Sequence, residues 1–152
     1  LGENSTINSK WTIHFDYPAN NHPMLNLSFG GFWYYAPGVE LDDNSWHHLA
    51  VTYTGKSNEQ GHPVTLLFID GTQRTISPAA HHPVRTHEDG QVMIETMEHT
   101  PLVMGATLSK DRQKLINPNQ FIRAQIDELF IIEGVINEDS IRQLMETNQL
   151  TH

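Results

Sequence analysis

The chain of 152 residues contains no cysteine, which excludes disulfide bonds, thiolate metal sites and cysteine nucleophiles. It has only nine basic residues against eighteen acidic ones, and its formal net charge is -9. A chain of this charge repels phosphate backbones and anionic bilayers, so we expect no nucleic-acid or membrane partner. No stretch approaches the roughly 20 consecutive apolar residues of a membrane span. The length predicts one domain, residues 1–152, with its own core.

The sequence also lacks an initiator methionine and a leader with a basic and then an apolar region. We therefore expect a processed chain or a piece of a longer one. The absence of cysteine leaves the compartment open, because many exported domains contain none.

Two runs of strand length are the strongest fold signal. Residues 46–53 and 66–71 are crowded with β-branched, aromatic and aliphatic side chains. The second run ends in Asp70-Gly71, a dipeptide typical of tight hairpin turns. Together they predict two adjacent antiparallel strands of a β-sandwich.

Further short strands are predicted on both sides of this pair, separated by Gly, Pro and Asn turns. A Pro- and His-rich loop over 77–89 and a polar loop over 109–119 interrupt them. The pattern predicts an all-β fold, an antiparallel β-sandwich. The remaining predicted strands cover residues 11–17, 24–29, 32–35, 39–41, 72–76, 92–94, 102–105 and 124–132.

The C-terminal stretch departs from the strand pattern. Asn137 is a good N-cap, and the two acidic residues after it oppose the helix dipole. Ile141, Leu144 and Met145 recur at helical spacing. One short helix is therefore predicted to close the chain and to pack on the sandwich.

Over residues 10–148 the order and spacing of these segments resemble the laminin G-like, or concanavalin A-like, jelly-roll domains. The most specific part is Ile126-Asp127-Glu128, which opens the last predicted strand before a turn and an acid-capped helix. The resemblance implies two curved antiparallel sheets packed face to face, with ligands on the concave face or at the rim loops. The segments that carry it are 46–53, 67–71, 102–105, 126–131 and 135–141.

Members of this group serve as sugar-binding, adhesion and accessory modules of secreted proteins, and some relatives hydrolyse polysaccharides. The resemblance therefore implies an extracellular, cell-surface or periplasmic location. Such domains usually have one or two strands before the segment at 11–17, and only ten residues precede it here. We expect the N-terminal strand to be short or missing, which leaves an edge open to a partner strand.

Hydrolysis is not supported by the carboxylates. Retaining glycosidases need two of them about 5 Å apart, and relatives place them at Glu-x-Asp-x-Glu or Glu-x-Asp-x-x-Glu spacing on one strand. Neither pattern occurs, and neither do Gly-x-Ser-x-Gly or His-Glu-x-x-His. We expect a protein without enzymatic activity.

Metal binding has two candidate positions. His82, His87 and Asp89 lie in the 77–89 loop, where they either converge on a metal or form a solvated, pH-sensitive loop. The resemblance makes Asp127 a candidate calcium ligand, and the alternative is that Asp127 caps a turn. His47 and His48 are adjacent, so on a regular strand they point to opposite faces and do not chelate one ion.

Sugar recognition would use flat aromatic faces together with polar side chains for the hydroxyls. Residues 32–35 offer four aromatics, and alternation sends Trp33 and Tyr35 to one face and Phe32 and Tyr34 to the other. Either pair is a candidate platform, and packing in the core is the alternative. The polar candidates are Asn21 and Arg74, and Asn20 and Asn44 are two further ones.

The expected function is a noncatalytic carbohydrate-binding or adhesion module of a secreted or cell-surface protein, binding a glycan, with calcium as the candidate cofactor. The rival is a structural or protein-interaction module that docks a partner chain or neighbouring domain through the open edge and the C-terminal helix.

Overall fold

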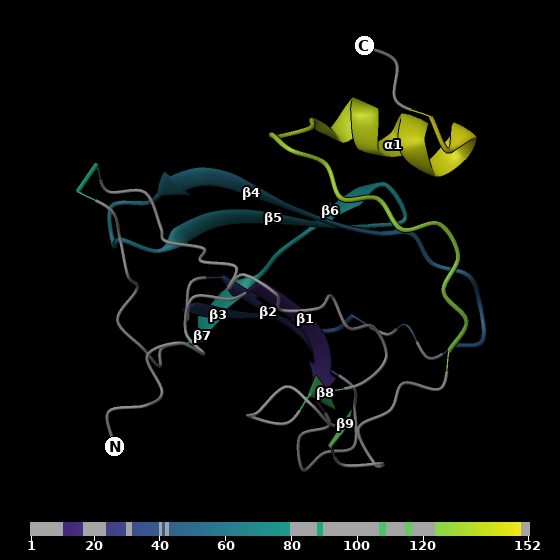
Figure 1. Ribbon diagram of the computed structural model, residues 1–152, viewed down its shortest axis with the longest axis horizontal. Coiled ribbons are helices and arrows are strands. Elements are labelled where there is room, and N and C mark those ends of the chain that lie inside the picture. Colours follow the sequence, from purple (N-terminus) through teal and green to yellow (C-terminus); the bar gives the residue numbers. More distant parts are fainter. Residues whose placement is uncertain are drawn as a thin grey trace. The chain divides into compact units, whose positions relative to one another are not determined.

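A computed structural model describes residues 11–16, 24–29, 32–39, 41, 43–79, 88–89, 107–108, 115–116 and 124–149. The chain divides into two compact units. One comprises Leu1–Glu95 with Glu133–His152, and the other comprises Thr96–Ile132. The fold is mostly β, with antiparallel sheets and one short C-terminal helix, as the sequence predicts in outline (Figure 1).

The first unit contains a four-stranded antiparallel sheet in the order β1-β2-β3-β7. Its strands alternate between two faces, so residues paired across the ladder share a face. Leu27, for example, pairs with Ile13 on one side and with Tyr34 on the other. The bounds are β1 (Trp11–Asp16), β2 (Met24–Phe29), β3 (Phe32–Ala36) and β7 (Ser77–Ala79).

The second sheet of this unit has three antiparallel strands, β4 (Leu49–Ser57), β5 (Pro63–Ile69) and β6 (Thr72–Arg74), in that order. Asp70 and Gly71 join the last two with positive φ angles of 52° and 69°. Two successive residues with positive φ match the right-handed twist of a hairpin, which is why Asp-Gly is favoured there. The predicted hairpin is confirmed.

The core of the first unit draws on both sheets. Every member is apolar or aromatic, and the four-stranded sheet supplies its members from alternate positions of β2 and β3. The Tyr34 hydroxyl donates a hydrogen bond to the carbonyl of Pro63, the first residue of β5, and so links the two sheets directly. The buried cluster comprises Leu25, Leu27, Phe32, Tyr34, Ala36, Val39, Leu67 and Ile69.

The predicted helix forms as α1 (Glu138–Thr147), and its ends are capped. The Asn137 side chain accepts from the Ser140 amide at 2.8 Å, and Asn148 closes the helix in the left-handed region. Ile141 and Leu144 are buried. The helix meets the β5–β6 turn, because a Cβ built on Gly71 would lie 3.1 Å from the Arg142 Cγ.

The second unit contains a two-stranded ribbon of β8 (Thr107–Leu108) and β9 (Leu115–Ile116). The predicted strand over 124–132 was wrong, because this stretch pairs with no strand in the part of the chain that is described. Glu128 has a φ of 52°, which breaks an extended run in its middle. Its apolar side chains are exposed, and Ile131 reaches 68%.

Other strand boundaries also differ from the predictions. Val39 and Leu41 lie outside any strand, and β7 occupies the first residues of the expected 77–89 loop. The predicted strands over 92–94 and 102–105 lie outside the described residues, as does the stretch before Trp11 that bears on the expected open edge.

Candidate functional site

Strand β3 presents its four aromatic rings to two different environments. Phe32 and Tyr34 are 4% and 6% exposed and belong to the core, where their ring centroids lie 4.9 Å apart. Burial raises the pKa of Tyr34 to about 12, with a further contribution from Tyr53. Trp33 and Tyr35 are half-buried on the opposite face. The alternation inferred from the sequence is thus present, and it leaves Trp33 and Tyr35 as the accessible pair.

Two polar residues of β2 share that outer face. Tyr35 pairs with Asn26 and Trp33 pairs with Ser28, and both polar residues are buried. We call these four residues the aromatic-polar face. The amide and the hydroxyl are each 5% exposed, so the two half-buried rings are the accessible part of this set. Sequence reasoning missed Asn26 and Ser28, although their alternation with Leu25 and Leu27 was the available signal.

A second constellation is built around His47, on the segment that leads into β4. Its Nδ1 lies 2.8 Å from Oδ2 of Asp70, and its Nε2 lies 3.0 Å from Oδ1 of Asp43. The other oxygen of Asp70 accepts from the His48 amide at 2.9 Å. We call Asp43, His47 and Asp70 the histidine bridge, because one ring spans two carboxylates.

The histidine bridge shifts the titration of its members. Hydrogen bonds to Asp70 and then to Asp43 raise the pKa of His47 above its ordinary value of 6.5. The bond from His47 lowers the pKa of Asp43. For Asp70, partial burial acts to raise the pKa, but the bonds from His47 and from the His48 amide outweigh it and lower the pKa.

A small pocket with a volume of about 190 Å³ lies beside the histidine bridge. Its walls mix the aliphatic Val39 and Ile69 with the polar His47, Asp70 and Arg74. Arg74 is exposed at the end of β6, and its charge lowers the pKa of Asp70. Of the predicted polar ligands, Arg74 is therefore in a pocket, but it is not on the aromatic-polar face.

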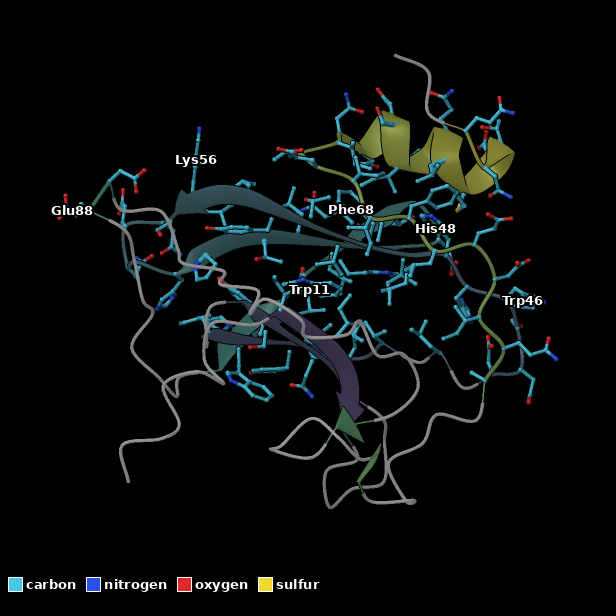
Figure 2. The ribbon with its side chains drawn as sticks, viewed as in Figure 1. Trp11, Trp46, His48, Lys56, Phe68 and Glu88 are labelled. Carbon is cyan, nitrogen blue, oxygen red and sulfur yellow. The ribbon has the colours of Figure 1, made fainter. Side chains whose placement is uncertain are left out.

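His47 and His48 both precede β4, and their rings lie in different surroundings. Partial burial lowers the pKa of His48, and within the described structure its Nδ1 is buried without a hydrogen-bond partner. The exposed Trp46 precedes the pair (Figure 2).

Of the predicted metal ligands, the structure describes Asp89 and Asp127. His82, His87 and Asn21 lie outside the described residues, whereas Asp89 and Asp127 are exposed. Among the residues that are described, no three His, Asp or Glu side chains gather so that they could hold a metal ion. Calcium binding at Asp127 and metal binding in the 77–89 loop therefore stay predictions.

Comparisons with known proteins found one similar solved structure and no matching family. No protein-family model matches the chain, and no curated protein matches it. One solved structure that is similar is a fragment of an S-layer domain-containing protein from Clostridium thermocellum. It is 18% identical over 90% of this chain, with a TM-score of 0.46, and the chain spans 63% of that fragment. In the described residues, no helix is long and apolar enough to cross a membrane.

Proposed function

We propose that this chain is a noncatalytic carbohydrate-binding or adhesion module, with a laminin G-like jelly-roll fold, of a secreted, periplasmic or cell-surface protein. The observation that carries the proposal is the placement of Trp33 and Tyr35 on the side of the four-stranded sheet that faces away from the core. Rings held at this position by strand pairing offer flat surfaces on which the C–H groups of a pyranose can stack.

The neighbours of the two rings hold them in place. Asn26 and Ser28 pair with them across the ladder and are each 5% exposed, so the rings and not these polar groups would meet a sugar. The chain carries a net charge of -9, which favours a neutral glycan over a sulfated or otherwise anionic one.

A noncatalytic role is supported by how the described carboxylates are used. Asp43 and Asp70 are the two that a single side chain brings together, and each is already hydrogen-bonded to His47. A carboxylate pair bridged in this way leaves no room between its members for the water or anomeric carbon that glycoside hydrolysis requires.

A glycan array followed by calorimetry on the best ligand tests the proposal. Trp33→Ala and Tyr35→Ala should each weaken binding about tenfold, the equivalent of one stacking contact of about 1.4 kcal/mol. Trp46→Ala is the matched control, because Trp46 is 65% exposed and lies outside the aromatic-polar face. Binding that survives both substitutions, or that falls equally in the control, would refute the assignment.

The rival function, a structural or protein-interaction module, is favoured by a separate observation. Large apolar side chains are exposed along 126–135, including Leu129, Phe130 and Ile131. Exposed apolar surface of this extent is a common mark of protein contact sites. Flat glycan arrays, together with a stable complex with a neighbouring polypeptide that Ile131→Asp abolishes, would favour this function over the first.

Calcium is a separable part of the proposal. Melting curves with added calcium and with EDTA should differ if Asp127 contributes to a site, and Asp127→Asn should remove the difference. Identical melting temperatures in both conditions would eliminate the calcium site. They would not affect the glycan-binding proposal, which the array tests separately.

A further inference from the structure

The two hydrogen bonds of the histidine bridge depend on the protonation state of the His47 ring. Both ring nitrogens of His47 lie within 3.0 Å of a carboxylate oxygen. A neutral imidazole has one N–H, so it can donate to one carboxylate only and turns a lone pair toward the other. Both contacts are hydrogen bonds only when the ring is an imidazolium.

The two carboxylates are anchored differently. Asp70 lies in the β5–β6 turn, where its side chain also accepts from the His48 amide and its own amide donates to the His48 carbonyl at 2.9 Å. Asp43 is held to the rest of the unit by His47, and its other bond, from the Ser45 amide at 2.8 Å, is local. Loss of the proton from His47 should therefore break its contact with Asp43 before its contact with Asp70.

We propose that His47 is a pH-operated latch: its protonated ring ties the turn at Asp43 to the β5–β6 turn, and loss of the proton releases Asp43 while Asp70 stays in place. Because His47 and Asp70 line the pocket beside Arg74, loss of the proton also changes the charge of the pocket wall.

The charges around His47 are consistent with this behaviour. Asp43 and Asp70 favour the imidazolium, whereas the nearby Arg74 and His48 do not bond to the ring. On the helix that meets the β5–β6 turn, Arg142 is paired with Glu138 at 2.5 Å. The two carboxylates in direct contact thus dominate, and the pKa of His47 is raised.

The direction of the pH effect follows from linkage. A histidine whose pKa is raised by folding contributes stability that is fully present below 6.5 and is lost as the pH rises through the folded pKa. Asp43 and Asp70 have lowered pKa values, so their contribution is present above 3.8 and is lost as the pH falls through their folded pKa values. The latch is therefore closed in a window between the two.

NMR titration of the full chain tests the latch. The imidazole signals of His47, assigned by their absence in His47→Gln, should titrate above 6.5. The protection factor of the Ser45 amide, which removes the base-catalysed rise of the intrinsic exchange rate, should fall through the same midpoint, while the His48 amide, bonded to Asp70, stays protected.

Asp43→Asn should move the His47 midpoint toward 6.5, because it removes one of the two carboxylates. Glu59→Gln is the matched control, since it deletes the same charge at the exposed tip of the β4–β5 hairpin. A His47 midpoint at or below 6.5, or a Ser45 protection factor that does not change with pH, would overturn the latch. Equal midpoints in Asp43→Asn and Glu59→Gln would overturn it too. If Asp43→Asn does not fold, the His47 titration and the Ser45 amide exchange of the unmodified chain still test the latch.

Discussion

Strand β3 and the stretch 124–132 differ in outcome although their compositions are alike. Both concentrate aromatic or aliphatic residues over a strand's length. β3 pairs with β2 on one side and with β7 on the other, and its side chains alternate between core and outer face. The stretch 124–132 has no such partner among the described residues, and its apolar side chains are exposed.

The difference shows what residue type alone decides. β-branched and aromatic residues fit a pleated surface, but the preference is realised only where a neighbouring strand takes up the backbone hydrogen bonds. Whether a segment forms a strand therefore depends on its partner strand as much as on its own composition.

The largest expected effect comes from phenylalanine placed either in a paired, buried strand or in the unpaired stretch 124–132. Phe68 of β5 is 2% exposed and Phe130 is 41% exposed (Figure 2 labels Phe68). Phe68→Ala should cost about 3–5 kcal/mol of unfolding free energy, whereas Phe130→Ala should cost about 0.5 kcal/mol or less. Urea unfolding of both variants measures this. Equal losses would mean that the stretch 124–132 is packed in solution, and the comparison would fail.

A smaller contrast concerns two glycines with positive φ. Gly71 lies against Arg142 and Met145 of α1, whereas nothing lies within 4 Å of a Cβ built on Gly134. Both alanine substitutions strain the backbone by about 1 kcal/mol, and Gly71→Ala should lose about 1 kcal/mol more because the helix has to shift. Thermal unfolding of the pair gives the difference. A larger loss at Gly134 would show that the segment after 132 is the more constrained of the two.

The helix provides a third case, because its hydrogen bonds are internal and need no neighbouring strand. Asn137→Ala removes the bond to the Ser140 amide and should cost about 1 kcal/mol. Asn137→Ser, which keeps a capping oxygen, is the control and should restore most of the loss. Circular dichroism during urea unfolding follows both. An unchanged alanine variant would mean that packing at Gly71, and not the cap, sets the start of α1.

The smallest expected effect is that of Glu128→Gly, and the sign of its change in unfolding free energy is what matters. Glu128 has a positive φ, so Glu128→Gly should relieve local strain and stabilise the chain by about 0.5 kcal/mol or leave it unchanged. In a regular strand the same substitution would destabilise by about the same amount. The sign of the change in unfolding free energy thus reports which conformation the stretch 124–132 has in solution.

The features that the sequence predicted well are those decided by neighbours in the chain. The Asp70-Gly71 turn, the alternation of 32–35 and the Asn137 cap all follow from local sterics and hydrogen bonding. The histidine bridge was missed because Asp43 and Asp70 are far apart in sequence and meet only through the packing of a turn against a hairpin. The strand at 124–132 failed for the same reason, since no local signal tells whether a partner is present.

The bond from the Tyr34 hydroxyl to the Pro63 carbonyl has a mechanical consequence. Apolar packing between two sheets has no preferred direction, so on its own it resists separation better than it resists sliding. A directional bond between the two sheets opposes that sliding, because any lateral displacement stretches or bends it. Under a shearing load the two sheets should therefore yield abruptly and together when this bond breaks, instead of creeping past one another.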